Sequence, residues 1–173
     1  MMVVLKGALV GRVTLRAPEL LSPDHLVSAF ACGEAVLDDG LKRRALANQA
    51  SGASRTFVVT NDQHQVVGYY ALAAGAVAHQ AASRNIRRNM PDPIPVMVLA
   101  RLAVDVRAQR AKLGAALLRD ALQRCLVVSQ QAGVRALLVH ALNERAQQFY
   151  EHYGFKASPA HPMTLMMRLP ERG

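Results

Sequence analysis

The segment Val96–Gln131 contains residue types, in a suitable order, for holding a phosphorylated ligand. An apolar run, Val96–Val104, predicts a buried strand, and a polar loop over residues 105–113 connects it to a helix. The first amides of a helix have no partner inside the helix, and the helix dipole favours negative charge beside them. Residues 101–124 carry six cations and two anions, a net charge of +4. We therefore expect this strand, loop and helix to bind an anion such as a phosphate.

The predicted helix has one apolar face, which must pack against the protein core. That face contains Leu113, Ala116, Leu117, Ala121, Leu122 and Cys125. Cys32 and Cys125 are far apart in the chain and lack the spacing of metal ligands, so both are expected to be buried, reduced thiols. The six histidines are scattered singly and form no zinc motif.

The N-terminal part of the chain predicts one strand and two helices. Arg12–Ala17 is predicted as a strand. A helix is predicted over Ser22–Ala31, because serine is a favoured N-cap and Pro23 suits the first helical position. A second helix is predicted over Ala35–Gln49, and Gly40 inside it should weaken it by about 1 kcal/mol relative to alanine. One face of this helix contains Leu37, Leu41, Ala45 and Asn48, whereas the other contains Lys42, Arg43 and Arg44.

The remaining segments predict mostly strands. They are an antiparallel hairpin of Thr56–Thr60 and Val66–Ala78 with a turn over residues 61–64, a strand Ala136–Ala141, a helix Asn143–Tyr153 closed by Gly154, and a last strand Met163–Leu169. Between them lies a polar arm, Ala82–Pro95, whose three prolines exclude a helix and favour an extended lead-in to the central strand. The predicted order is β-α-α-β-β-β-α-β-α-β.

The size and composition fit one domain over residues 1–173, with a substantial core that needs no disulfide or metal. The net charge is +9 and the isoelectric point is about 10.4, which favours a polyanionic partner, above all nucleic acid. Residues 1–11 are too short an apolar run to span a bilayer and lack a cleavage site, so we expect a flexible extension and a cytoplasmic protein.

The element order, the loop before the long helix and the segment FYEHYGF resemble the GCN5-related N-acetyltransferase (GNAT) fold, an α/β (α+β) fold with a mixed central sheet flanked by helices. In that family the loop after the fourth strand binds the pyrophosphate of acetyl-coenzyme A and reads Gln/Arg-x-x-Gly-x-Gly/Ala. Here Gln109 and Gly114 match that pattern, and Lys112 replaces its first glycine.

Further segments resemble one branch of this family, the acetyltransferase toxins of type II toxin–antitoxin pairs. These segments are CGEAVLDDGLKRRA (Cys32–Ala45), SRTFVV (Ser54–Val59), MPDPIPVMVLARLAVD (Met90–Asp105) and NERAQQFYEHYGF (Asn143–Phe155). The resemblance covers roughly residues 12–169. It implies an enzyme that acetylates the α-amine of aminoacyl-tRNA and so blocks translation. It also implies a homodimer and a ribbon-helix-helix antitoxin, which represses the operon by binding operator DNA together with the toxin.

The resemblance also implies which residues hold acetyl-coenzyme A, the acetyl donor. The backbone of Leu102, Ala103 and Val104 would hold the pantetheine arm and the thioester carbonyl. The loop would bind the pyrophosphate through Gln109, Arg110, Ala111, Lys112, Leu113, Gly114 and Ala115. Asn143 would contact the cofactor or serve as the N-cap of the last helix, and both interpretations stay open.

Tyr150 matches the family's general acid, which protonates the departing sulfur of coenzyme A. A tyrosine has a pKa of about 10 and a thiol of about 8.5, so full proton transfer is uphill by about 2 kcal/mol. The tyrosine therefore acts best by donating a hydrogen bond to the sulfur as charge develops. The alternative is a tyrosine that packs the last helix on the sheet, a role that suits Tyr153 as well. No residue is identified as a general base.

Two clusters of cations are candidates for phosphate contacts to tRNA, which need positive charge but no strict geometry. They are Arg84, Arg87 and Arg88 in the polar arm, and Lys42, Arg43 and Arg44 in the second helix. The alternative for each cluster is a solvated face. The arm is the better candidate, because it directly precedes the strand that leads to the cofactor loop.

The chain departs from the family pattern where glycine is common. Arg110 and Lys112 occupy such positions in the loop, and Ala100 does so before Arg101. A side chain at a left-handed position costs about 1–2 kcal/mol, whereas the added charge favours pyrophosphate. Gly40 stands where a bulky aromatic residue is usual. We therefore expect a working site with altered cofactor affinity.

Two other functions fit the same residues. One is a GNAT enzyme that acetylates a protein or a small amine, although an acidic surface would suit that better than this basic chain. The other is a catalytically weak protein that mainly binds the antitoxin and, with it, operator DNA.

Overall fold

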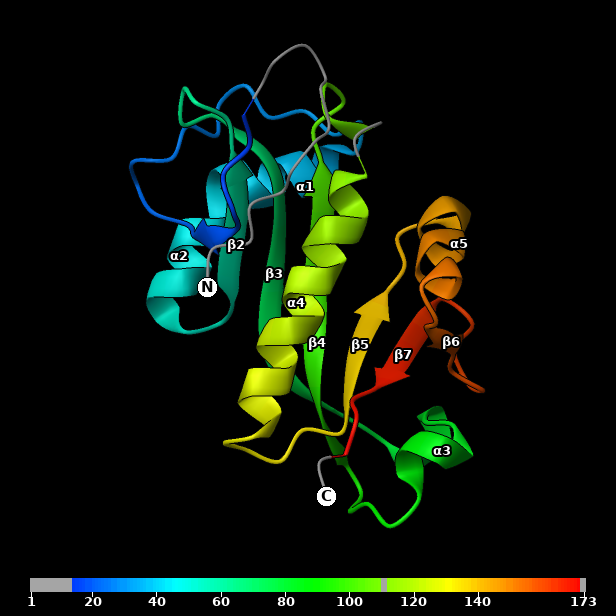
Figure 1. The fold of residues 1–173 in the computed structure, drawn as a ribbon. Helices are drawn as coiled ribbons and strands as arrows, with labels where there is room; N and C mark the ends of the chain where they lie inside the picture. Colours follow the sequence, from blue (N-terminus) through cyan, green and yellow to red (C-terminus); the bar gives the residue numbers. More distant parts are fainter. Residues whose placement is uncertain (1–13, 110–111, 172–173) are drawn as a thin grey trace. The chain divides into compact units, whose positions relative to one another are not determined.

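Seven strands form a mixed sheet in the order β1-β2-β3-β4-β5-β7-β6 (Figure 1). The computed structural model describes residues 14–109 and 112–171. The strands are β1 (Glu19–Leu20), β2 (Arg55–Thr60), β3 (Val66–Val77), β4 (Ile94–Val104), β5 (Ala136–His140), β6 (Lys156–Ala157) and β7 (Thr164–Arg168). The α-helices are α1 (Ala35–Asp39), α2 (Ala45–Ser51), α3 (Arg84–Arg87), α4 (Leu113–Ser129) and α5 (Glu144–His152). A π-helical segment, η1 (Gly40–Arg44), and a 3₁₀ turn, η2 (His79–Ala81), complete the helical elements of the described residues.

The chain forms two compact units, each with its own buried core. The first consists of Met1–Leu72 and Arg101–Ala121, and the second of Ala73–Ala100 and Leu122–Gly173. The core of the first unit contains Leu21, Phe30, Leu41, Ala45, Val58, Val66, Tyr69 and Ala103. The core of the second unit contains Val77, Ala81, Ala82, Ile86, Ile94, Val96, Ala136, Leu138 and Met166.

The predicted hairpin and the two strands of the central parallel pair are confirmed. β2 and β3 pair antiparallel, and the Asn61 side-chain oxygen accepts the backbone N–H groups of Gln63 and Gln65 in the turn between them. β4 and β5 pair in parallel, as alternating α/β segments require. β6, a strand of two residues, was not predicted and pairs with β7.

The predicted first strand and first helix are wrong. Residues 14–17 form no strand, and β1 begins at Glu19, whereas Arg12 and Val13 lie outside the described residues. Residues 22–31 form turns, because Leu26 pairs with the hairpin turn: its N–H donates to the His64 carbonyl, and its carbonyl accepts the Val66 N–H, each at 2.9 Å. These long-range bonds replace the helical ones that the local pattern predicted.

The predicted second helix is one helical stretch in three parts, α1, η1 and α2. Leu41 and Ala45 are buried on the predicted face, and Leu37 and Asn48 are half-buried. The stretch ends at Gly52, whose φ of +81° gives a left-handed C-cap that glycine adopts without strain.

The polar arm contains one helical turn, which its three prolines were predicted to exclude. The turn, α3, lies before the first of those prolines, so none of them breaks it. Ile86 of α3 is buried in the core of the second unit, which gives this short helix an anchor.

The two thiols differ in their burial. Both are free, but Cys125 is buried on the apolar face of α4, whereas Cys32 is half-buried, so the prediction of a buried thiol is wrong for Cys32. Burial and a hydrogen bond with Asp38 raise the pKa of Cys32 to about 11, and burial raises that of Cys125 to about 12. Both thiols therefore stay protonated at neutral pH.

The N-terminal half of α4 packs closely on β3 at Gly68. A Cβ atom built on Gly68 would lie 3.0 Å from Leu113 Cδ2 and 3.1 Å from Leu117 Cδ1, which is tighter than ordinary contact. Tyr70 of β3 also donates a hydrogen bond to the Asp120 carboxylate of α4. Glycine at position 68 therefore sets how closely the start of α4 approaches the strand.

Replacing Gly68 with valine should lower the free energy of unfolding by about 1–3 kcal/mol, because the new methyl groups overpack the contact with Leu113 and Leu117. Gly133→Val is the matched control, since nothing lies within 4 Å of a Cβ atom at Gly133. Urea unfolding of both variants measures the difference. Equal stability of the two variants would show that α4 does not need glycine at position 68.

Candidate active site

The loop after β4 is fixed by the carboxylate of Asp105, which is fully buried. Its Oδ2 atom accepts the Ala31 N–H at 3.1 Å, and its Oδ1 atom accepts the Arg107 N–H at 2.9 Å. The Arg107 guanidinium also donates to both oxygens, at 2.8 and 3.1 Å. Burial alone would raise the pKa of Asp105, but the hydrogen bonds from Arg107 and Ala31 outweigh it and lower that pKa below its usual value. Asp105 is therefore ionised and fully hydrogen-bonded, and the sequence analysis did not identify this role.

The backbone of the same residues ties the loop to two other segments. Asp105 N–H donates to the Val67 carbonyl of β3, and Val106 N–H donates to the Ala31 carbonyl, each at 2.8 Å. Two hydrogen bonds therefore join the end of β4 to Ala31, and a third joins it to Val67 of β3. This bracing holds residues 105–107, the first residues of the loop, at the end of β4.

Gln109, the first residue of the loop motif, joins two other segments through hydrogen bonds of its side-chain amide. Its Nε2 atom donates to the Cys32 carbonyl at 2.9 Å and to the Val104 carbonyl at 3.0 Å. Both hydrogens of this amide are thus committed to the loop itself. A contribution of Gln109 to ligand binding would therefore come from its backbone rather than its side chain.

Lys112 has the backbone conformation that its motif position demands of glycine. Its φ is +56°, in the left-handed region, and its side chain is exposed. The Lys112 carbonyl accepts the Ala116 N–H at 3.2 Å, so this residue leads directly into α4. Arg110 and Ala111, which were also predicted to bind the cofactor, lie outside the described residues. The loop therefore keeps its left-handed turn at Lys112 despite the loss of the glycine.

The remaining predicted cofactor residues of the first unit line the strand end and the first helical turn. Ala103 and Leu113 are buried, whereas Leu102, Val104, Gly114 and Ala115 are half-buried. The strand end and the first turn of α4 thus each contain two partly accessible residues. This arrangement can accept an extended chain that ends in a phosphate.

Tyr150, within α5, and Asn143, the N-cap residue directly before it, lie in the second unit. The Asn143 side-chain oxygen accepts the Ala146 N–H at 2.9 Å, which is the N-cap bond of this helix. The predicted stop at Gly154 is confirmed, since this residue has a φ of +96°. The N-cap interpretation of Asn143 thus has direct support in the structure, and a cofactor contact stays a prediction.

The ring of Tyr150 is buried between two other aromatic rings. Its centroid lies 5.1 Å from that of Phe149, edge to face, and 5.4 Å from that of Phe155. Its hydroxyl makes no hydrogen bond with the described residues. Burial raises the pKa of Tyr150 well above its ordinary value. Tyr153, by contrast, is 40% exposed and packs on Phe149.

The arginines of the polar arm are exposed on a segment that Arg135 holds in place. The Arg135 guanidinium donates to the carbonyls of Ile86 at 2.9 Å and of Asn85 and Arg88 at 3.2 Å, which cap the end of α3. It also pairs with Glu171 at 3.0 Å, and Arg168 contacts both Glu171 and Asn85. The predicted tRNA contacts Arg84, Arg87 and Arg88 therefore extend from a fixed backbone.

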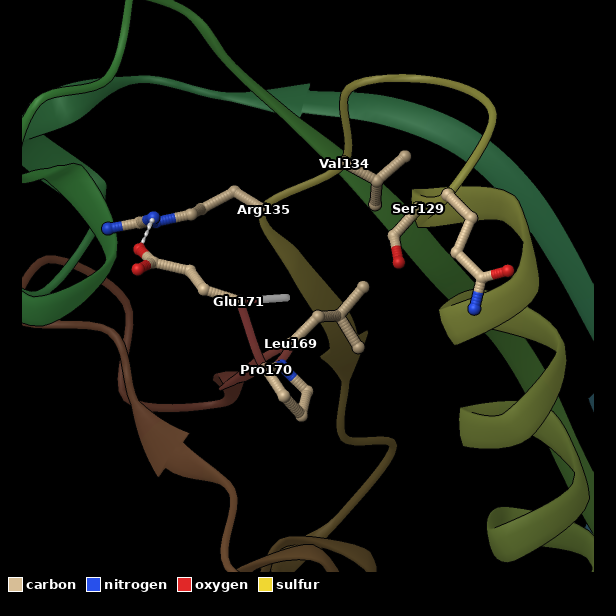
Figure 2. Close-up of a pocket in the computed structure, with 7 residues that line it drawn as sticks. Ser129, Val134, Arg135, Leu169, Pro170 and Glu171 are labelled. Carbon is tan, nitrogen blue, oxygen red and sulfur yellow. Dashed lines mark hydrogen bonds and ion pairs between the residues drawn. The ribbon is translucent and has the colours of Figure 1, made fainter. Parts of the chain in front are cut away.

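A pocket of about 470 Å³ lies beside this ion pair (Figure 2). It is lined by Ser129, Gln130, Val134, Arg135, Leu169, Pro170 and Glu171. Figure 2 shows the Arg135 and Glu171 side chains directed at each other. Both charged groups in the lining of this pocket thus already have a partner.

The second predicted cluster of cations lies in η1 of the first unit. Lys42, Arg43 and Arg44 are all exposed, and Arg43 approaches Asp39 at 3.8 Å, a surface pair of little energetic value. Their side chains are thus available to an anion. Across residues 14–109 and 112–171, no cluster of His, Cys, Asp or Glu could hold a metal ion. In the same residues, no helix has the length and apolar character needed to cross a membrane.

Comparison with known proteins gives a consistent result. Residues 52–157 match the family model described as an acetyltransferase (GNAT) domain. The chain is similar to a tRNA-acetylating toxin of Mycobacterium tuberculosis (strain ATCC 25618 / H37Rv), with 50% identity over 155 residues that cover 90% of this chain and 93% of the toxin.

Two solved structures show the same similarity. The toxin AtaT complexed with acetyl-methionyl-tRNAfMet has a TM-score of 0.82 and 28% identity, and the match covers 89% of this chain and 94% of AtaT. A mutant of AtaT bound to acetyl-coenzyme A and to the C-terminus of the antitoxin AtaR has a TM-score of 0.77 and 27% identity, with coverage of 90% and 93%.

Replacing Asp105 with asparagine should lower the free energy of unfolding at pH 7 by about 1–3 kcal/mol, because the variant loses charge-assisted bonds to Arg107 and Ala31. Since the folded state lowers the pKa of Asp105, its contribution is complete above the unfolded value of about 3.9 and disappears as the pH falls through the folded value. Urea unfolding at a series of pH values should therefore show the two proteins converging in acid.

Asp62→Asn, an exposed position in the hairpin turn, is the control for this substitution. It should leave the unfolding curve unchanged across the same pH range. A stability gap between wild type and the Asp105 variant that does not narrow as the pH falls below about 4 would contradict the role given to the carboxylate charge.

Proposed function

Because the chain belongs to the GNAT family of acetyltransferases, we propose that it is a toxin that transfers acetyl from acetyl-coenzyme A to the α-amine of aminoacyl-tRNA. The observation that carries this proposal is the 50% identity, over nine-tenths of the chain, with a tRNA-acetylating toxin. The net charge of +9 fits an RNA substrate. Acetylation of the amine would stop the charged tRNA from supporting translation.

The first unit would hold the acetyl donor. The backbone of Leu102–Val104 would take the pantetheine arm, and the amides of Leu113–Ala115 would face the pyrophosphate at the start of α4. The exposed ammonium of Lys112 would add a positive charge beside those phosphates. Arg110 and Ala111 stay in this set as predictions from the motif. The left-handed turn at Lys112 supports a working loop over a degenerate one.

Tyr150 would supply the proton that the leaving sulfur needs. The neutral amine attacks the thioester carbonyl carbon, a C–N bond forms, the C–S bond breaks, and the sulfur carries the electron pair away. Burial keeps the phenol protonated at neutral pH, so Tyr150 acts as a hydrogen-bond donor and acid rather than as a base. The amine's own proton would leave to water, since no base is assigned.

Transfer of labelled acetyl to a pool of charged tRNA tests this function. Wild type should label the aminoacyl group, and Tyr150→Phe should lower kcat by about 10²–10⁴-fold with acetyl-coenzyme A still bound, because the leaving sulfur loses its donor. Tyr153→Phe, at the exposed neighbouring tyrosine, is the matched control and should keep wild-type activity.

The other outcomes separate the alternatives. Cofactor binding without label on tRNA would indicate a protein or a small amine as the acceptor. Absence of both label and cofactor binding would leave a protein that mainly binds its antitoxin. Full activity of Tyr150→Phe would remove Tyr150 from the mechanism.

The exposed cations would bind the tRNA backbone. Replacing Arg84, Arg87 and Arg88 with glutamine should weaken tRNA binding and reduce the slope of log K against log salt by about 0.9 for each lost phosphate contact. The same substitutions at Lys42, Arg43 and Arg44 test the second cluster. Filter binding at several salt concentrations gives both slopes, and an unchanged slope would identify a cluster as a solvated face.

The partners follow from the same proposal. A ribbon-helix-helix antitoxin would neutralise the toxin, and the complex of the two would bind operator DNA and repress the operon. The toxin itself would be a homodimer that acts on tRNA in the cytoplasm. Copurification of the product of a neighbouring small gene, followed by an operator mobility-shift assay, would test these partners together.

A further inference from the structure

Glycine is needed at position 40 because of the neighbouring Arg101 side chain, and not because of its own backbone conformation. Its φ of −57° and ψ of −47° are ordinary helical values, which alanine adopts with a better helix propensity. However, a Cβ atom at this position would lie 2.1 Å from Arg101 Nη1, 2.6 Å from Cζ and 3.0 Å from Nε. The guanidinium of Arg101 therefore rests directly on the Cα atom of Gly40.

The guanidinium has no partner of its own among the residues that the structure describes. Arg101 is half-buried and makes no hydrogen bond or ion pair with them. The Tyr69 hydroxyl, on which the charge of Arg101 acts, is already engaged, since it donates to the Leu37 carbonyl at 2.6 Å. Arg101 acts on Tyr69 through its charge, since it partly offsets the effect of burial, which raises the pKa of that phenol.

A half-buried cation without a partner is costly, because it has lost part of its hydration and gained no anion in return. Arg135 of the second unit shows the usual solution, in which carbonyls and a carboxylate satisfy the guanidinium. Arg101 differs from it in this respect. The guanidinium of Arg101 lies against Gly40 and carries several N–H donors in one plane. Such a group matches a phosphate or a carboxylate in shape and charge.

The position of Arg101 selects between these two anions. Arg101 lies on β4 three residues before Val104, so about 10 Å of extended strand separates it from the strand end where the thioester is proposed to lie. The α-amine of the acceptor must reach that thioester. The α-carboxyl group of an aminoacyl-tRNA is esterified and carries no charge, so the anions that every such acceptor offers near the amine are the 3′-terminal phosphates.

We propose that Arg101, seated on Gly40, binds a phosphate at the 3′ end of the acceptor tRNA and so positions the aminoacyl group. This inference rests on the proposed function and adds the residue that recognises the acceptor end. Lys42, Arg43 and Arg44 follow Gly40 in η1 and are exposed, so the chain offers further cations along the same helical stretch of the first unit. Gly40 keeps the guanidinium in place.

Two variants separate the charge of Arg101 from its placement. Arg101→Met removes the charge, whereas Gly40→Ala keeps the charge but pushes the flexible end of the arginine away from its seat. Each should lower kcat/KM for aminoacyl-tRNA about tenfold or more and reduce the salt slope of tRNA binding by about 0.7, the value for one phosphate of a single strand. KM for acetyl-coenzyme A should not change, and the melting temperature of Gly40→Ala should equal or exceed that of wild type.

A phosphate-free acceptor and the double variant complete the experiment. Puromycin, an aminoacyl nucleoside with a free α-amine and no phosphate, should be acetylated equally by wild type and both variants. Gly40→Ala should have no further effect when Arg101 is already methionine, because the two substitutions remove the same contact.

Three results would overturn the inference while the proposed function stands. They are an unchanged salt slope in both variants, equal losses with tRNA and puromycin, and additive effects in the double variant. If wild type itself neither binds nor acetylates aminoacyl-tRNA, the proposed function fails and this inference fails with it.

Discussion

The buried carboxylate of Asp105 is the constraint on which the candidate active site depends. It follows β4 directly, and its hydrogen bonds to Ala31 and Arg107 fix the first residues of the loop. Because the carboxylate is ionised inside the protein, each of these bonds is charge-assisted, and losing one leaves a charge poorly solvated. Residues 105–107 are therefore held by bonds within the protein itself, and Gln109 adds to this bracing by joining Cys32 to Val104.

The arginines discussed above differ in whether a carboxylate or a carbonyl of the protein accepts hydrogen bonds from the guanidinium. Arg107 and Arg135 are paired with carboxylates, and Arg135 also caps the carbonyls of α3, so both act inside the fold. Arg84, Arg87 and Arg88 are exposed on the segment that Arg135 fixes. Arg101 is half-buried and has no such partner among the described residues. The count of 21 lysines and arginines thus overstates the number of cations available to RNA, and the hydrogen bonds indicate which of them already have partners inside the fold.

Local patterns predicted the elements that depend on local interactions. The hairpin, β4 with α4, and α5 with Asn143 and Gly154 at its ends follow from periodicity, turn residues and caps. The failures have long-range causes. Residues 22–31 had a good helix start, but Leu26 pairs with the hairpin turn some forty residues later. The turn α3 is capped by Arg135, which lies about fifty residues away in sequence. Gly40 appeared as a weakness of its helix because the sequence does not show that Arg101 occupies the space beside it.

Lys112 illustrates how a departure from a motif can preserve the motif's shape. The loop needs a left-handed residue before α4, and glycine provides one without strain. Here lysine adopts a φ of +56°, at a cost of about 1–2 kcal/mol, which the folded loop must supply through its other contacts. The bonds around Asp105 and the side chain of Gln109 are suited to supply it, since they hold both ends of the strand-to-loop segment. In return, an ammonium group lies where a glycine would offer only its backbone amide. The strained backbone of Lys112 is therefore explained if the loop binds an anion. This connects Lys112 with the phosphate groups of acetyl-coenzyme A, the acetyl donor of the GNAT family.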